Sequence, residues 1–576
     1  MNNWNLDDLF KSDKELEKSV QKIDLEAQRF EKQYKGKLYS IKTKDFIKAL
    51  KVYENILNSI GRAGTYAFLK FASNSDNGGF YAKYSSKFNI IQENLLFFEL
   101  EFNKLQKDKQ KKIIKKSGLY EHYLKSLKKE KKHQLSAKEE KILLKKSLTS
   151  SRAFSRLFDE HFSRLKFDFN GLKISEEEIL SKLYSSDRVV REKAAKSLSK
   201  ELKDNIHLTS YIYNMVKTDL KIECDIRRYK TVEEPRHIDN QITQKSVDAL
   251  INTASKNFSL SQEYYKIKKE ILGYEKLFDY DRYAPYENES ENISFDEAKE
   301  LVLAAFKNFD KKFYKIAKKA LDEGWCDVFP KDKKRGGAFS HPASTDTHPF
   351  VMLNYTSKRR DIFTIAHELG HAIHQYLSRK VGYIGSDTPL TTSETASVFA
   401  EMLLFDYIKT ITPKEELLGL YGGKLEDIFA TLFRQIIFTM FERKVHSCED
   451  EVSVKEFNDF WIDENKKMFG EGVTLSEDYQ LWWSYIPHFI HTPFYCYAYS
   501  YGQLLVMALY GLYKKKTPNF IQIYKKFLSS GGSKSPKELI GMFGFDIEDE
   551  KFWEIGIEEV SKLFEEFKLI RKNSAE

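Results

Sequence analysis

The segment DIFTIAHELGHAIHQYL, residues 361–377, constrains the fold more strongly than any other stretch of the chain. Its apolar side chains recur every three or four residues, which is the spacing of a buried stripe on an α-helix. The stripe consists of Ile362, Ile365, Leu369, Ile373 and Tyr376. The pattern therefore predicts an amphipathic helix over residues 361–377, with one face turned toward a hydrophobic core.

Two histidines of this predicted helix point to a metal site. His367 and His371 stand four residues apart, so they lie one above the other with Cβ atoms roughly 6 Å apart. At that separation both imidazoles can reach one zinc ion at about 2.0 to 2.1 Å. Glu368 projects about 100° around the helix, beside the metal, where its carboxylate can take a proton from a metal-bound water. The pattern predicts a catalytic zinc site, whereas His374 alone is expected to be structural.

A catalytic zinc ion usually takes three protein ligands, so a third residue is needed. The chain breaks over residues 382–389, and a second helix is expected to restart behind the hydroxyl residues 391–393, any of which can cap it. This helix offers Glu394 and Glu401 on one face, two turns or about 10.5 Å apart, so only one can bind the metal directly. The spacing favours Glu394, which lies closer to the loop, and leaves Glu401 as the alternative.

Composition predicts a mainly α-helical protein. Glycine and proline are scarce, at 26 and 11 of 576 residues, while 41% of the residues are hydrophobic and 14% aromatic. Because the chain is longer than the size at which one core stops growing, at least two lobes are expected. We divide the sequence into an N-terminal helical region, residues 1–185, and a catalytic domain that contains the predicted zinc site, residues 186–576.

Local patterns refine this division. Short breaks between helices are predicted at residues 73–79 and 167–171, and a loop at 280–294 precedes a helix that begins with FDEAKELVLAAF. The apolar run 350–355 predicts a strand of a small β-sheet beside the zinc helix. As an edge strand it can hold an extended peptide by β-augmentation, and a purely structural strand is the equal alternative.

Charge gives little support for a nucleic-acid partner. The net charge is +9, and 94 basic residues are interleaved with 85 acidic ones. The lysine-rich run at residues 107–146 is interpreted as a solvated helical hairpin, because no aromatic stacking platform or nucleic-acid motif accompanies it. The alternative is a patch that binds nucleic acid or an anionic surface, and it would be favoured by binding that falls steeply with added salt.

The expected location is the cytoplasm. The first residues alternate charges and contain no apolar segment of the kind found in secretory signals, and no apolar run approaches the length of a membrane span. Four cysteines are scattered without paired spacing, which suits a reducing compartment. They are Cys224, Cys326, Cys448 and Cys496.

These motifs resemble a known family. HELGHAIH, followed 27 residues after its first histidine by ETASVFAE, is similar to the zinc metallopeptidases of the thimet oligopeptidase and oligoendopeptidase F group. The resemblance implies that His367, His371 and Glu394 bind one zinc ion per chain and that Glu368 is the catalytic base. It also implies a two-lobed helical fold that encloses the site and favours short peptides. Other segments resemble oligoendopeptidase F and extend the match over most of the chain: WNLDDLF near the start, EEPRHIDNQI at 233–242, YDRYAP at 280–285 and GGAFS at 336–340.

The segment IPHFIHTPFYCYAYSYGQLL, residues 486–505, is similar to the histidine and tyrosine segment that completes these active sites. Thr492 is expected to cap a helix that begins at Pro493. Tyr495 and Tyr499 then share one face of this helix, and Tyr497 and Tyr501 share another.

A phenol or imidazole from this segment can stabilise the oxyanion that forms when water attacks a peptide carbonyl. Because tyrosines occur at every second position, the family pattern can be aligned with this segment in more than one register. Two assignments of the catalytic histidine and tyrosine therefore stay open. The position of the small residue Gly502 favours His488 and Tyr499 as catalytic residues, with His491 and Tyr495 as the alternatives.

Together these patterns predict a zinc-dependent endopeptidase that hydrolyses short peptides, with no nucleic-acid or membrane partner. The alternative is a zinc-stabilised helical binding protein without peptidase activity. Structural zinc sites are usually closed by four ligands rich in cysteine, and no cysteine lies near the predicted zinc helix, which argues against that alternative.

Overall fold

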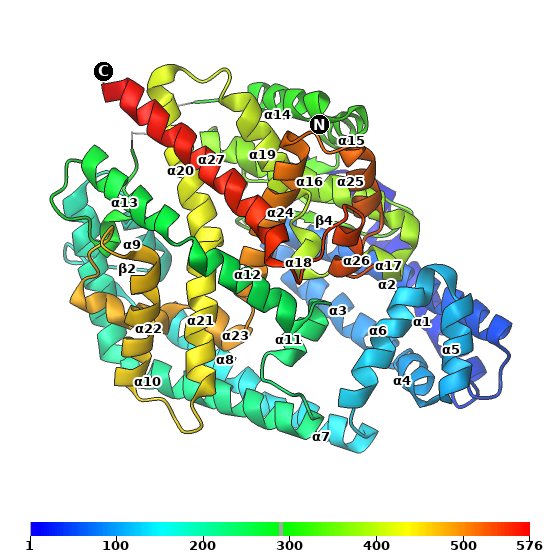
Figure 1. The fold of residues 1–576 in the computed structure, drawn as a ribbon. Helices are drawn as coiled ribbons and strands as arrows, with labels where there is room; N and C mark the ends of the chain where they lie inside the picture. Colours follow the sequence, from blue (N-terminus) through cyan, green and yellow to red (C-terminus); the bar gives the residue numbers. More distant parts are fainter. Residues whose placement is uncertain (1, 287–291, 576) are drawn as a thin grey trace. The chain divides into compact units, whose positions relative to one another are not determined.

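The protein is described by a computed structural model that covers residues 2–286 and 292–575. Most of these residues are helical and only two small sheets occur among them, which confirms the predicted fold class (Figure 1). The chain forms two compact units, each built from three stretches of sequence. The first unit comprises Met1–Lys131, Glu289–Ile411 and Lys516–Gly544, and the second comprises Lys132–Asn288, Thr412–Lys515 and Phe545–Glu576. The boundary predicted after residue 185 stays a prediction.

The first unit contains two groups of helices and a three-stranded sheet. Its N-terminal helices are α1 Asp13–Tyr34, α2 Thr43–Ser73, α3 Gly78–Glu93, α4 Phe97–Lys104, α5 Lys107–Lys116 and α6 Glu121–Glu130. Its other helices are α14 Phe295–Phe309, α15 Lys311–Asp322, α16 Arg359–Ser378, α17 Tyr383–Ser386, α18 Leu390–Ser393, α19 Ser397–Ile408, α25 Phe520–Ser529 and α26 Pro536–Gly541.

Helix α16 is the predicted histidine helix. It packs against α14, α15, α19 and α25 and against the sheet, and four residues of its predicted stripe, Ile362, Ile365, Leu369 and Ile373, are buried. Asp361 in its first turn ties the preceding segment to the helix, since its Oδ2 accepts the backbone N–H of Thr356 at 2.7 Å and of Lys358 at 3.2 Å. Packing on several sides therefore holds the helix rigidly, as a metal site requires.

The sheet of the first unit lies beside α16, as the sequence predicts. Its order is β3 Cys326–Asp327, β5 Phe350–Met352 and β4 Phe339–His341, with β5 parallel to β3 and antiparallel to β4. Of the two alternatives for the run 350–355, the edge strand is wrong because β5 is paired on both sides, and the purely structural strand is the one that the structure shows. Strand β4 is joined to α16 by Ser340 Oγ, which donates to Gln375 Oε1 at 2.8 Å, and by Gln375 Nε2, which donates to Ser340 O at 3.0 Å.

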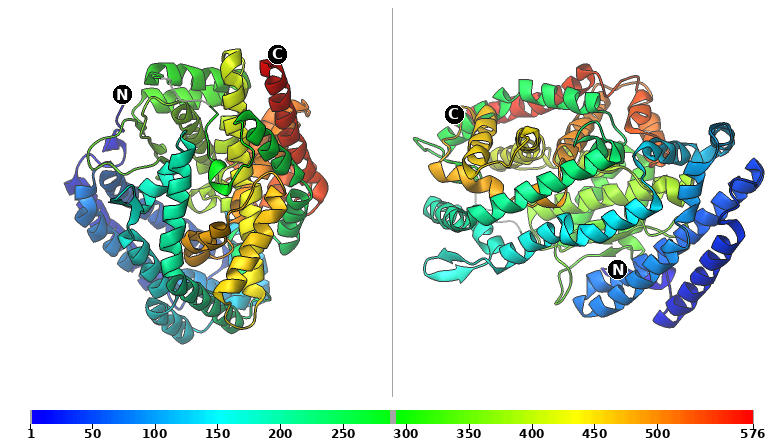
Figure 2. Two further views of the ribbon diagram at one scale, coloured as in Figure 1. Left: turned by 90° about the vertical axis from the view of Figure 1, so that its left-hand side faces the viewer. Right: turned by 90° about the horizontal axis from the view of Figure 1, so that it is seen from below.

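The second unit is built around the 40-residue helix α10 Arg188–Arg227. Helix α8 Ser151–Arg164 packs along it and leads into the hairpin of β1 Phe167–Phe169 and β2 Leu172–Ile174, where a break is predicted (Figure 2). In the same unit α27 Glu550–Ala575 packs along α24 Tyr497–Lys514 (Figure 1). The remaining helices are α7 Ala137–Lys146, α9 Glu176–Lys182, α11 Glu234–Asp239, α12 Gln244–Lys256, α13 Ser259–Ile271, α20 Leu417–Thr431, α21 Phe433–Ser447, α22 Val454–Phe469, α23 His488–His491, α24 Tyr497–Lys514 and α27 Glu550–Ala575.

Other local predictions have mixed outcomes. The break at 73–79 is present between α2 and α3, and α14 follows the predicted loop at 280–294, of which residues 287–291 lie outside the described residues. The lysine-rich run 107–146 is not one hairpin, because α5 and α6 belong to the first unit and α7 to the second. Across the part of the chain that the structure describes, every helix is too short or too polar to cross a bilayer.

Candidate metal and catalytic site

Three side chains of the first unit converge on one point. Nε2 of His367 lies 3.2 Å from Nε2 of His371, and Oε2 of Glu394 lies 3.3 Å from each of these nitrogens. These are the three residues that the resemblance implies as ligands, and all three are half-buried. Because carboxylate and imidazole lone pairs meet here, the group is compatible with a metal ion.

Glu394 reaches the histidines from a turn. The expectation that Glu394 lies on the restarted helix is wrong, because α18 ends at Ser393 and α19 begins at Ser397. The predicted hydroxyl cap is also absent, since neither Pro389 nor Ala396, the residues that precede these two helices, makes a side-chain cap. The carboxylate is fixed instead by Ser397, whose Oγ donates to Glu394 Oε2 at 2.7 Å.

Glu401 contacts the same histidine from its other side. Its Oε1 lies 2.6 Å from Nδ1 of His367, so His367 turns Nε2 toward Glu394 and Nδ1 toward Glu401. A carboxylate on Nδ1 fixes the ring orientation and makes Nε2 a better metal ligand. The two glutamates that the spacing left as alternatives therefore occupy different positions on one histidine.

The electrostatics of the group favour a bound positive charge. Burial opposes a charge on His367, but Glu394 and Glu401 outweigh it and raise the pKa of His367 to about 10. Burial similarly opposes a charge on Glu394, and the two histidines hold the pKa of Glu394 well below its ordinary value. A metal ion bound here would supply the positive charge that these carboxylates favour.

Glu368 lies beside the group but takes no part in it. It is 6% exposed, its Oε2 has no hydrogen-bond partner within the described residues, and burial raises its pKa. A carboxyl with a raised pKa and a free oxygen is a candidate for accepting and releasing a proton. His374 is 4% exposed, burial lowers its pKa to about 4, and it lies outside the group, as expected of a structural histidine.

The predicted histidine and tyrosine residues form a cluster in the second unit. His488 Nε2 lies 3.2 Å from the hydroxyl of Tyr499, and the rings of Tyr495 and Tyr499 are 5.1 Å apart. All three are partly exposed, and the pKa of His488 is lowered by burial and by the nearby His491 and Arg434. The cluster therefore offers a neutral imidazole and two phenols at its surface.

The other members of the segment point elsewhere. His491 is exposed, and its Nε2 lies 2.7 Å from Asp159 Oδ1. Tyr497 and Tyr501 are buried on the opposite face of α24 from Tyr499, as the predicted spacing requires.

The predicted start of the helix in this segment is wrong. Thr492 ends α23, and α24 begins at Tyr497 rather than at Pro493. The intervening turn contains Phe494 at a φ of 59°, a left-handed conformation that bulky residues rarely adopt. Sequence periodicity assumed one continuous helix from residue 493 and so missed this turn.

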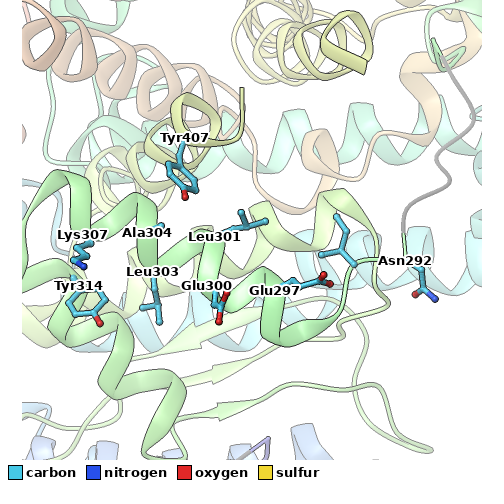
Figure 3. A pocket seen from close by; sticks show the side chains of 10 residues that line it. Asn292, Glu297, Glu300, Leu301, Leu303, Ala304, Lys307, Tyr314 and Tyr407 are labelled. Atoms are coloured by element: carbon cyan, nitrogen blue, oxygen red, sulfur yellow. The ribbon is translucent and has the colours of Figure 1, made fainter. Parts of the chain in front are cut away.

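A separate groove of about 860 Å³ lies in the first unit, along α14 and the adjoining ends of α15 and α19 (Figure 3). Glu300 and Lys307 of α14 and Tyr407 of α19 are among its lining residues, and no residue of the metal group lines it. This groove is therefore not part of the candidate catalytic site.

Comparison with known proteins decides the family. Residues 181–559 match the sequence profile described as Peptidase family M3, and residues 101–167 match the one described as Oligopeptidase F. The chain belongs to peptidase family M3. The predicted resemblance is thereby confirmed, and the family supports a peptidase that acts on peptides.

Relatives of this M3 peptidase match along nearly its whole length. Oligopeptidase PepF of Bacillus subtilis is 29% identical over 98% of this chain and 86% of its own. An oligoendopeptidase F homolog of Borreliella burgdorferi is 28% identical over 98% of both chains. Among solved structures, a putative peptidase of Chlamydophila abortus superposes with a TM-score of 0.90 at 24% identity, over 99% of this chain and 98% of its own. Oligoendopeptidase-F of Enterococcus faecium gives 0.72 at 24% identity, over 97% and 99%. These structures share the helical fold.

Two supporting residues of this M3 peptidase were missed by sequence reasoning. Gly370, between Glu368 and His371, lies where a side chain would meet the backbone of Ala396. Glu442 of α21 is fully buried, and its Oε1 accepts the backbone N–H of the left-handed Phe494 at 2.8 Å. The glycine within HELGH was a visible signal for the first, whereas no local pattern marks Glu442.

Proposed function

We propose that this M3 peptidase is a zinc-dependent endopeptidase that hydrolyses short peptides. The observation that carries the proposal is the convergence of His367, His371 and Glu394 beside the buried carboxylate of Glu368. Three ligands with an adjacent base are the arrangement of catalytic zinc sites, which leave a position open for water or substrate.

The donor distances support zinc as the metal. Ligands about 2.0 to 2.1 Å from a tetrahedral zinc ion lie about 3.3 Å from one another. The separations between the three donor atoms are 3.2, 3.3 and 3.3 Å. We propose one zinc ion per chain, held by His367, His371 and Glu394, with Glu401 orienting His367. When bound, zinc lowers the pKa of a coordinated water and polarises the scissile carbonyl.

Glu368 is proposed as the general base. Its carboxylate accepts a proton from the attacking water and passes it to the leaving amine, so no covalent intermediate is needed. Burial raises its pKa, which makes its carboxylate a stronger base toward the proton of the water.

The donors to the oxyanion are also a proposal. His488 and Tyr499, which lie 3.2 Å apart and are partly exposed, are the favoured pair, and His491 and Tyr495 are the alternatives. The contact between His491 and Asp159 supports the favoured pair, since it engages His491 elsewhere. A preference for short peptides, a cytoplasmic location and the absence of nucleic-acid and membrane partners stay predictions.

The test is a ladder of peptides of increasing length, incubated with the purified protein with and without a chelator and followed by mass spectrometry of the products. Internal cleavage of peptides of about five to twenty residues, lost with chelator and restored by zinc, is the expected result. A protein that holds zinc and cuts no peptide is instead the zinc-stabilised binding protein, and efficient digestion of unfolded casein contradicts the preference for short peptides.

A further inference from the structure

Two arginines in the second unit, the buried Arg282 and the half-buried Arg434, make no ion pair within the described residues. Arg434 of α21 donates from Nη1 to the hydroxyl of Tyr283 at 3.0 Å, and its guanidinium lies 5.1 Å from the ring centre of Phe438. Its Nε is buried and has no hydrogen-bond partner within the described residues. Arg282, next to Tyr283 in the YDRYAP segment, is 3% exposed, and its Nη2 likewise has no partner there.

No carboxylate of the described structure pairs with either arginine. Asp279 is the nearest candidate, but its backbone carbonyl, not its side chain, accepts from Arg282 Nε at 2.8 Å. Its Oδ1 accepts the backbone N–H of Ser476 at 2.7 Å. Arg282 lies instead over aromatic faces, including Tyr283 at 5.0 Å. The Asp279 carboxylate still acts on Arg282 electrostatically, because the charge of each favours the ionised form of the other. Arg434 is therefore the arginine that lacks a negative partner among the described residues.

Two other arginines of the same unit, the buried Arg191 and the half-buried Arg443, are paired. Arg191 forms an ion pair with Asp281 at 2.9 Å, and Arg443 donates to both oxygens of Glu233 at 2.8 and 2.9 Å. Burying a charge without a partner is costly, so an unpaired arginine among paired ones indicates that its partner is an external anion. Consistent with excess positive charge, Arg282 and Arg434 outweigh the effect of burial and lower the pKa of Tyr283.

A ligand can reach this cluster. Tyr283 and Arg434 are partly exposed, and the ring of Tyr283 lies 4.7 Å from that of Tyr184, which is 62% exposed. Arg434 also lies close enough to His488 to lower its pKa, and His488 is a proposed oxyanion donor. The unpaired charge is therefore near a residue with a proposed role in the reaction.

We propose that Arg434, together with Tyr283 and Arg282, binds a carboxylate, namely the C-terminal carboxylate of the peptide substrate. Guanidinium and phenol groups are the donors that carboxylates take in proteins, and a charge-assisted hydrogen bond is about twice as strong as a neutral one. The inference rests on the proposed peptidase function and adds a preference for free peptide termini. A small free carboxylate such as acetate has the same chemistry and is the other source of ligand.

The first arm of the test uses pairs of peptides with one sequence, ending in a free acid or in an amide. For the parent protein, kcat/KM is expected to be roughly ten- to a hundredfold higher for the acid. Arg434→Met should bring this ratio close to one, chiefly by lowering kcat/KM for the acid, and Tyr283→Phe should lower the ratio partly. Arg156→Met is the matched control, because Arg156 of α8 is 79% exposed and paired with Glu160.

The second arm measures the thermal midpoint in sodium acetate and in sodium sulfate at equal ionic strength. A thermal midpoint that rises only in acetate in the parent protein, and no longer rises in Arg434→Met, supports the site. If the parent also shows an acid-to-amide ratio near one, the ligand is a free anion rather than a peptide terminus. This arm does not depend on peptide hydrolysis. A failure of the proposed peptidase function would therefore be seen separately, as uncut peptides in the first arm. Arg434→Lys covers the case in which Arg434→Met fails to fold.

Two results overturn the inference. One is a parent protein with neither an acid preference nor an acetate-specific shift. The other is a tyrosinate absorption band at pH 7 that disappears in Tyr283→Phe. Such a band would mean that the phenolate of Tyr283 itself neutralises the arginines, so that no external anion is needed.

Discussion

Gly370 of α16 lies directly against the backbone of Ala396: a Cβ atom built on Gly370 would stand 2.5 Å from the carbonyl oxygen of Ala396. Gly370 precedes His371, and Ala396 follows Glu394 by two residues. The absence of a side chain at position 370 therefore permits the close approach that brings Glu394 to the histidines.

Replacing this glycine should weaken the metal site. In Gly370→Ala the added methyl group must push the turn at residues 394–396 away from α16, and overpacking of this kind typically costs about 1 to 3 kcal/mol. We expect roughly tenfold or greater loss of zinc affinity, measured by competition with a chelator. Gly423→Ala is the control, because a Cβ there meets nothing within 4 Å, and its zinc affinity should equal that of the parent.

The two glutamates on His367 should differ in their effect on the metal. Glu394→Ala removes a proposed ligand and should strip zinc, whereas Glu401→Ala removes only the partner of Nδ1 and should lower affinity by about 10 to 100-fold. Zinc content by atomic absorption, with and without a competing chelator, separates these cases. Full zinc in Glu394→Ala together with none in Glu401→Ala would show that the ligand assignment is wrong.

Glu368→Gln should distinguish the role of the proposed general base from that of the metal ligands. The amide keeps the shape of the side chain but cannot accept the proton, so zinc content should be retained while kcat falls by about 10² to 10⁴ with little change in KM. Turnover of a quenched fluorescent peptide measures the loss. A variant with full zinc and a rate within a few-fold of the parent would contradict the proposed mechanism.

Two tyrosines of α24 provide a matched pair. Tyr499→Phe should lower kcat less than Glu368→Gln, because it removes one of several possible oxyanion donors, and should leave stability unchanged. In Tyr497→Phe the amide of Asn240, which donates to the Tyr497 hydroxyl at 2.9 Å, loses its buried acceptor. About 1 to 3 kcal/mol of stability should be lost there, measured by urea unfolding. If Tyr499→Phe lost stability and Tyr497→Phe lowered kcat instead, the predicted faces of α24 would be wrong.

Glu442 should make stability depend on pH. Burial raises its pKa to about 8, above the unfolded value of about 4.5, so the folded state favours the protonated acid. Its contribution is fully present below pH 4.5 and is lost as pH rises through 8. Glu442→Gln, a neutral isostere, should match the parent at low pH and exceed it above pH 8 by on the order of a few kcal/mol. Urea midpoints of the parent and of Glu442→Gln that change in parallel with pH would contradict this prediction.

Much of the candidate site was predictable because its information is local. The periodicity of residues 361–377 fixed one helix, and a helix of known pitch fixes the relation of His367, Glu368 and His371 without any tertiary contact. The same reasoning placed Tyr499 and Tyr497 on opposite faces, since both lie on one continuous helix in the structure.

Predictions failed where the helix was assumed to continue. Glu394 was assigned to a helix that is interrupted by a turn, and the start of α24 was placed four residues early because Phe494 adopts a left-handed conformation. The run 350–355 left an edge strand and a purely structural strand as equal alternatives, since a strand's own residues do not reveal how many neighbours pair with it. Pairing and turn geometry depend on partners elsewhere in the chain.

The sequence by itself determined a helical peptidase of family M3 with a two-histidine motif and an adjacent carboxylate. Only the tertiary structure decided that Glu394 meets both histidines while Glu401 holds the far side of His367. It alone joined Arg434 to Tyr283, which is 151 residues away along the chain. The physical reason is that helix periodicity sets relations within a few turns, whereas the packing of one element on another selects which distant side chains meet.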